Sequence, residues 1–306
     1  MPLKLFIMLS LCLFSQTPLL ANAGCGEKGV WLQVLGSGGP EVDDQRASSG
    51  YVIWHDGKAR ILVDLGAGSL LHFEQSGASI NDLDYILLSH FHVDHVNDLA
   101  ELVKASYFTD RNRDLPLYGP TGNQLMPSAD RYVQALFGTA GAYKYLSSYL
   151  DGSDSYRLLA HNVEADEKKV KDTHVVVDDF FYHISTVPVH HGPIPSLAWR
   201  IDIGGKSIVF SGDMNNDNNS LEILAKQADL LVAHHAIPEE ATGIARDLHM
   251  PPTVIGKIAV KAKVKQLVLS HRMNRTLGRE PASTHFIRQA YSGPLYYAED
   301  MQCFQP

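Results

Sequence analysis

Short apolar runs recur along this chain, and many are separated by longer segments whose apolar residues fall on one helical face. The runs are rich in Val, Ile, Leu and aromatic residues, which is typical of buried β-strands. They cover residues 30–36, 51–54, 60–66, 85–89, 115–119, 180–189, 197–203, 206–212, 229–234 and 265–271. Helical spacing predicts helices near residues 97–107, 123–137, 219–227, 251–262 and 282–290. In each half of the chain strands come first and helices follow, which predicts two sheets packed face to face with helices outside.

Four of these runs end on residues that can bind a metal ion. "YILLSH" ends at His90, "IVFSGD" at Asp213, "LLVAHH" at His234 and His235, and "QLVLSH" at His271. A buried strand cannot leave histidine or aspartate unpaired in its interior, so these side chains should lie where the strands reach the surface. We therefore expect several strand ends to converge on one polar site.

The segment "SHFHVDHVNDL", residues 89–99, concentrates ligand-type residues most strongly, with His90, His92, Asp94 and His95 close together. An extended backbone from His90 to His92 would point both imidazoles to one side, and a turn after them would bring the other two alongside. Four such groups can serve two adjacent ions. Imidazole and carboxylate ligands without a nearby cysteine suit zinc, with manganese or iron as alternatives. So many ligand-type side chains in so short a segment disfavour the alternative that these are solvated histidines of a loop.

The first residues have a different character. Residues 1–23, "MPLKLFIMLSLCLFSQTPLLANA", combine an early cation, an apolar stretch and small residues at the end, which predicts a cleaved signal peptide. The mature chain would then be periplasmic or secreted, would begin at Gly24 and would fold as one domain over residues 24–306. The alternative is an uncleaved anchor, but the apolar stretch is broken by Ser15, Gln16 and Pro18. We expect no stable membrane span in the mature chain.

Two cysteines, Cys25 and Cys303, would remain after cleavage, one near each end of the mature chain. In an oxidising compartment they form a possible disulfide that ties the ends together. Two unrelated buried thiols are the alternative. A lipid anchor on Cys25 is disfavoured because Asn22 stands where a lipobox usually has leucine.

Composition limits the class of protein and its partners. The chain is 45% apolar and 20% charged, as in folded globular proteins. Its net charge is −8, and loss of residues 1–23, whose one charged residue is Lys4, would leave −9. A structured nucleic acid would be repelled by this charge, whereas a small anionic ester could still bind through metal ions.

The motifs together resemble the metallo-β-lactamase superfamily. Its H-x-H-x-D-H signature stands at residues 90–95, and further similar motifs follow the family's order along nearly the whole mature chain. These are "LVDLGAG" (62–68), "HGPIPSLAWR" (191–200, similar to the ribonuclease Z-like branch), "SGDM" (211–214) and "LSHRM" (269–273). The resemblance implies an α+β fold, the four-layer αββα sandwich, with a two-metal site along one edge. It also implies that Asp64 orients ligands and does not bind metal.

The resemblance assigns the ligands by position. One ion would take His90, His92 and His191, the other would take Asp94, His95 and His271, and Asp213 would lie between them. His190 competes with His191, since neighbours in an extended chain point in opposite directions. The Gly-Pro pair that follows favours His191.

The implied chemistry is hydrolysis. Two divalent ions can share a water and lower its pKa, so that a bridging hydroxide attacks the substrate. Asp94 could accept a hydrogen bond from this hydroxide. His249 resembles the catalytic histidine of ribonuclease Z and could donate to a phosphoryl oxygen or protonate the leaving group. The alternative for His249 is a helix-start histidine bonded to backbone.

Two features depart from ribonuclease Z. His235 stands where those enzymes usually have a glutamate beside the catalytic histidine, and we expect it to lie next to the ligands in that glutamate's place, with Glu239 or Glu240 as possible substitutes. Residues 138–179 are acidic, where many ribonuclease Z enzymes carry a basic arm, and are expected to form a lid or rim.

The sequence thus predicts an exported dinuclear zinc hydrolase that acts on a phosphodiester. Exported relatives on the same branch include cyclic-nucleotide phosphodiesterases and arylsulfatases, so a sulfate ester is the second prediction. A lactone or β-lactam ring, and a metal-binding protein without turnover, are the further alternatives. A homodimer is expected only because similar proteins often dimerise.

Overall fold

The computed structural model describes residues 25–168 and 172–306. The predicted signal peptide, residues 1–23, lies outside the described residues. Among those that are described, no helix has the length and apolar character needed to cross a membrane.

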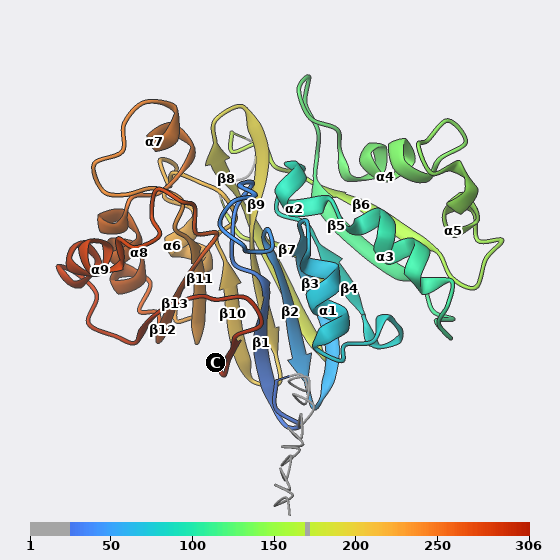
Figure 1. Cartoon of the computed structure of the whole chain (residues 1–306), viewed down its shortest axis with the longest axis horizontal. Coiled ribbons are helices and arrows are strands. Elements are labelled where there is room, and N and C mark those ends of the chain that lie inside the picture. Colours follow the sequence, from blue (N-terminus) through green and yellow to red (C-terminus); the bar gives the residue numbers. More distant parts are fainter. Residues whose placement is uncertain (1–24, 169–171) are drawn as a thin grey trace, which may run out of the picture.

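The strands of the described residues form two seven-stranded sheets (Figure 1). The first runs in the order β14 (Cys303–Phe304), β1 (Val30–Gly36), β2 (Gly50–His55), β3 (Lys58–Leu65), β4 (Tyr85–Leu87), β5 (Leu115–Pro120) and β6 (Leu158–Val163). The second runs β13 (Leu295–Tyr297), β12 (Gln266–Ser270), β11 (Leu230–His234), β10 (Lys206–Phe210), β9 (Ile194–Ile203), β8 (Tyr182–His191) and β7 (His174–Asp178). Both sheets combine an antiparallel part with a parallel part.

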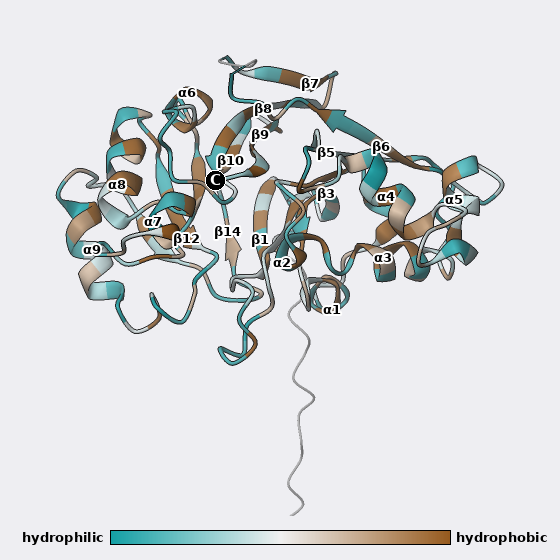
Figure 2. Ribbon diagram, turned by 90° about the horizontal axis from the view of Figure 1, so that it is seen from above, coloured by the Kyte–Doolittle hydropathy of each residue, from teal (hydrophilic) through white to brown (hydrophobic). Residues whose placement is uncertain are grey.

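Helices cover the outer faces of both sheets, as Figure 2 shows from above. Against the first sheet pack α1 (Ser69–Gln75), α3 (Leu99–Ser106), α4 (Ala129–Phe137) and α5 (Ser148–Asp151), with short 3-10 helices at Ile80–Asp82 and Lys144–Leu146. Against the second pack α6 (Leu221–Leu224), α8 (Pro252–Lys261) and α9 (Glu280–Arg288). Two short helices, α2 (Val93–Val96) and α7 (Ile244–Leu248), lie at the upper edge in Figure 1.

Successive side chains of the strands point to opposite faces of each sheet. Their apolar members form three layers, one between the sheets and one under each set of helices. In β2, Tyr51 and Ile53 point between the sheets, whereas Val52 and Trp54 point toward the helices. This is the period of two expected for a strand buried on both faces. The predicted αββα sandwich is confirmed.

Parallel pairing brings the strand ends to one edge. In the second sheet β10, β11 and β12 are parallel and in register, with Phe210 opposite Val232 and His234 opposite Ser270. In the first sheet β3 and β4 are parallel, with Val63 opposite Leu87. The residues that follow these strands therefore gather at the same edge of the sandwich.

Two predictions for individual elements were wrong. The helix expected over residues 123–137 begins only at Ala129, because the side chain of Asn123 accepts the backbone N–H groups of Leu125 and Met126 and holds a loop. The acidic segment 138–179 is not simply a lid, since it contains β6 and β7, which extend the two sheets by pairing with β5 and β8.

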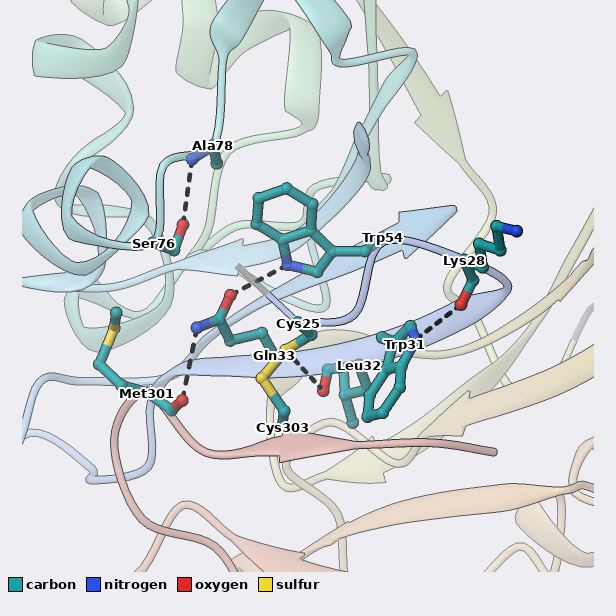
Figure 3. The surroundings of a disulfide bond; sticks show 10 residues. All are labelled: Cys25, Lys28, Trp31, Leu32, Gln33, Trp54, Ser76, Ala78, Met301 and Cys303. Carbon is teal, nitrogen blue, oxygen red and sulfur yellow. Dashed lines mark hydrogen bonds between the residues drawn. A yellow bond between two sulfur atoms is a disulfide. The ribbon is translucent and has the colours of Figure 1, made fainter. Parts of the chain in front are cut away.

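The chain ends of the described region are joined at the edge of the first sheet. Cys25 and Cys303 form a disulfide, with Cα atoms 5.7 Å apart and a sequence separation of 278 (Figure 3). Cys303 belongs to β14, which pairs with β1 at Gln33. The structure thus has the disulfide, and not two separate thiols or a lipid on Cys25.

Candidate metal centre

Seven histidine and aspartate side chains from both sheets meet at the edge where the parallel strands end. His90 and His92 follow β4, Asp94 and His95 lie in α2, His191 ends β8, Asp213 follows β10 and His271 follows β12. All are buried except His92, which is partly exposed. These are the seven residues that the sequence predicted as ligands.

One group that could hold an ion consists of His90, His92, His191 and Asp213, with ligand atoms all within 4.8 Å of one another. The Nδ1 atom of His92 lies 3.0 Å from Nε2 of His90 and 3.4 Å from Nε2 of His191. The Oδ2 atom of Asp213 is 3.9 Å and 3.7 Å from the same two Nε2 atoms. Four donors thus face one point.

A second group consists of His95, Asp213, His234 and His271. The Nε2 atom of His95 lies 3.6 Å from Oδ2 of Asp213, and Nε2 of His271 lies 3.2 Å from Oδ1. Asp94 joins this group, since its Oδ2 is 3.5 Å from Nε2 of His95 and 3.9 Å from Nε2 of His271. Asp213 belongs to both groups, as a bridging carboxylate would.

Hydrogen bonds behind the imidazoles fix which nitrogen faces the centre. The carboxylate of Asp64 lies 2.8 Å from Nδ1 of His95, and it also accepts the backbone N–H and the hydroxyl of Ser89. The Leu248 carbonyl lies 3.0 Å from Nδ1 of His191. Each Nδ1 therefore carries a proton, and each Nε2 faces the centre, where it can bind an ion. Asp64 occupies the orienting position expected of it.

The residues present fit a divalent cation. The Nε2 atom of His95 is buried, faces the centre and has no hydrogen-bond partner in the described part of the chain, which suits a nitrogen that binds an ion. Burial and the nearby His95 and His191 lower the pKa of His90 well below its usual range, which keeps this imidazole neutral and able to bind metal. Burial would raise the pKa of Asp213, but His271 and the hydrogen bond from His234 hold it well below its usual range. Nitrogen and oxygen donors without sulfur suit zinc.

His190 and His191 point in opposite directions, as expected in an extended strand. Nδ1 of His190 lies 2.9 Å from a carboxylate oxygen of Glu167, on the side away from the ligands. There it lines a cavity of about 740 Å³ that also includes Gly192. The structure thus places His191, and not His190, in the centre.

His249 faces the same centre from the end of α7. Its ring centre is 5.5 Å from that of His191 and 6.0 Å from that of His271. Its Nδ1 lies 4.0 Å from Oδ1 of Asp213 and has no hydrogen-bond partner among the described residues. The side chain is therefore free for a ligand, contrary to the alternative of a histidine bonded to backbone.

His235 does not take the place expected of it beside the ligands. Its Nε2 lies 2.9 Å from the hydroxyl of Ser283, and its ring packs against Tyr297, away from the centre. Because neighbours in a strand point to opposite faces, His234 faces the ligands and His235 faces α9. The prediction that His235 lies next to the ligands was wrong.

Glu239 and Glu240, the suggested substitutes, bind elsewhere. Glu239 accepts the backbone N–H of Thr253 near the start of α8, and Glu240 pairs with Arg279.

Sequence reasoning missed two contributors. His234 was recognised as a strand-end residue but was not included among the site residues, although the strand period allows only one of the pair 234–235 to face the centre. The other is Tyr51, whose hydroxyl lies 3.3 Å from Nε2 of His234. Tyr51 belongs to an apolar run, and nothing in the sequence around it indicates a site residue.

Comparison with known proteins gives consistent matches. A family model described as "Beta-lactamase superfamily domain" matches residues 59–272. A ribonuclease Z of Mycobacterium sp. (strain KMS) is 27% identical over 286 residues, covering 86% of this chain and 93% of the relative.

Two solved structures share the fold. The metallo-beta-lactamase fold protein YhfI from Bacillus subtilis has a TM-score of 0.69 at 21% identity, covering 91% of this chain and 100% of that one. The short form of human tRNase Z has a TM-score of 0.68 at 19% identity, covering 90% and 98%. At these identities the structural likeness establishes the fold alone.

The Asp64 contacts generate a prediction. Asp64→Asn removes the negative charge that holds the Nδ1 proton of His95, so zinc affinity should fall by about 10–100-fold. Competition with a chromogenic chelator measures this affinity. Glu167→Gln, which alters the partner of His190 outside the centre, is the matched control and should bind zinc as the unmodified protein does. Equal affinity of the Asp64→Asn variant and the control would contradict the orienting role.

Proposed function

This chain belongs to the beta-lactamase superfamily, and from that premise we propose that it is a dinuclear zinc hydrolase acting on a phosphodiester in a small anionic substrate. The observation that carries the proposal is the sharing of Asp213 by two groups of buried ligands. The likeness to ribonuclease Z over most of both chains supports a phosphodiester as the bond that is cleaved.

Two bound zinc ions would lower the pKa of a shared water and stabilise the charge on the oxygens of the ester. The chain's own residues would orient the reactants around them. Asp94 lies beside His95 and His271, where its carboxylate could accept a hydrogen bond from the attacking water and so orient it.

His249 would act on the substrate directly. Burial, in spite of the nearby charge of Asp213, lowers its pKa to about 3, so the free imidazole is neutral and carries one N–H. Such a group donates a hydrogen bond to a phosphoryl oxygen, and a dianionic transition state would strengthen this bond. We therefore favour hydrogen-bond donation over full proton transfer for His249.

Acidic residues on the neighbouring surface support a small substrate over a long polyanion. The cavity that His190 lines, on the side of β8 away from the ligands, is also lined by Glu164, Asp166 and Glu167, with Lys168 as its cation. Together with the net charge of −8, this acidic surface would disfavour binding of the backbone of a structured RNA that extends beyond the centre. Because relatives of this chain are ribonuclease Z enzymes, RNA is the alternative substrate that must be tested beside small esters.

We propose that the protein acts outside the cytoplasm, after removal of residues 1–23. Two observations support this proposal. The pattern of those residues is that of a signal peptide, and a disulfide between Cys25 and Cys303 is typical of oxidising compartments.

The export proposal predicts the chemical state of the mature protein. Mass spectrometry of the protein from an expressing bacterium should find Gly24 as the first residue, and thiol labelling of the denatured, unreduced chain should find no free cysteine. A cytoplasmic full-length chain with three reactive thiols would contradict the proposal.

The substrate proposal predicts a pattern across chromogenic compounds. The zinc-loaded protein should hydrolyse bis-p-nitrophenyl phosphate but neither p-nitrophenyl sulfate nor nitrocefin, because two cations and a hydrogen-bond donor suit a tetrahedral phosphate ester. Chelation should abolish the activity, and added zinc should restore it. The reverse preference would assign a sulfatase or lactamase, and faster cleavage of a precursor tRNA would overturn the small-substrate assignment.

The proposed role of His249 predicts a loss of turnover without a loss of metal. His249→Ala should lower kcat on bis-p-nitrophenyl phosphate by about 10²–10⁴-fold, the usual contribution of such a group. Metal analysis should find the same zinc content as in the unmodified protein, and His190→Ala should change neither quantity. A loss of zinc parallel to the loss of activity would show that His249 is a ligand.

A further inference from the structure

His234 lies in the second ligand group, but its distance to Asp213 differs from those of the other members. Its Nδ1 is 2.7 Å from Oδ1 of Asp213, within the range of a strong hydrogen bond. The Nε2 atoms of His271 and His95 lie 3.2 Å and 3.6 Å from the nearer carboxylate oxygen of the same residue.

Coordination geometry separates these two kinds of contact. Two ligands of one tetrahedral zinc ion, each bonded at about 2.0–2.1 Å, lie roughly 3.3 Å from each other. The contacts of His271 and His95 with Asp213 are close to this value. The contact of His234 is too short to have an ion between the two atoms, and it suits an N–H that donates to a carboxylate.

The opposite side of the His234 ring is also held. The hydroxyl of Tyr51 lies 3.3 Å from Nε2 of His234 and 2.9 Å from the hydroxyl of Ser270, the residue before His271. Tyr51 is fully buried on β2 of the first sheet, so it reaches across the sandwich to the second sheet. The backbone N–H of His234 donates to the hydroxyl of Ser211. The ring is thus fixed between the two sheets.

We propose that His234 is a positioning residue, held by Tyr51, that sets the orientation of the Asp213 carboxylate and does not itself bind metal. The inference depends on the proposal that the centre holds metal, and not on the proposed substrate. Its hydrogen bond to Oδ1 stops the carboxylate from rotating. The other oxygen, Oδ2, is then kept toward His95 and His191, one from each ligand group, at 3.6 Å and 3.7 Å.

Two substitutions at this position distinguish a donor from a ligand. His234→Ala removes both a hydrogen-bond donor and a ligand atom. His234→Asn keeps an N–H close to the place of Nδ1, but an amide nitrogen has no lone pair for zinc. Tyr51→Phe removes only the support behind the ring. His190→Asn makes the same exchange outside the centre and is the matched control.

The test is the zinc affinity of each purified chain, measured by chelator competition, with thermal unfolding of the metal-free proteins as a check on folding. His234→Ala should bind zinc about 10–100-fold more weakly, as is usual when a partner of a ligand is lost. His234→Asn should recover most of this loss, Tyr51→Phe should lose less than His234→Ala, and the control should match the unmodified chain.

Each other outcome overturns the inference in a recognisable way. If His234→Asn binds as weakly as His234→Ala while its metal-free form unfolds normally, His234 is a ligand. If His234→Ala binds as tightly as the unmodified chain, the residue does not position Asp213. If the unmodified chain binds no zinc, the proposed function fails together with the inference, whereas the first two results leave that function standing.

Discussion

The buried carboxylate of Asp213 is the group around which the rest of the centre is arranged. It is buried and lies within 3.9 Å of imidazole nitrogens from both ligand groups. An ionised carboxylate inside a protein is costly unless cations or hydrogen bonds surround it. Although burial would lower them, the nearby carboxylates raise the pKa of His95 and the pKa of His271, so these two rings can carry the compensating charge as protons when no ion is bound. Divalent ions bound to the same nitrogens would take the place of those protons.

The αββα fold meets this constraint by bringing the parallel ends of both sheets to one edge. His90 and its neighbours follow β4 of the first sheet, and Asp213 and His271 follow β10 and β12 of the second sheet. Behind them, Asp64 and main-chain carbonyl groups such as that of Leu248 hold the ring nitrogens in one orientation. The apolar layers on either side exclude water, which strengthens these polar contacts.

Much of this arrangement could be predicted from local patterns. Apolar runs that end in histidine or aspartate predicted the strand ends. The high density of potential metal ligands in residues 90–95 predicted the centre. The orientation of His235 differs from the prediction because the resemblance to ribonuclease Z places this residue beside the ligands, whereas the strand period points His234 inward. The support given by Tyr51 and by backbone carbonyl groups depends on contacts between distant segments, and single residues in a sequence carry no trace of them. Strands β6, β7, β13 and β14 are the four edge strands of the two sheets. They form by pairing with a neighbouring strand, and their own composition does not predict them.

Anomalous X-ray diffraction from zinc-loaded crystals tests the central claim most directly. The account predicts two peaks, one among His90, His92 and His191 and the other among Asp94, His95 and His271, with Asp213 in contact with both. A single peak that Asp213 does not touch, or no zinc at this edge of the sandwich, would contradict it.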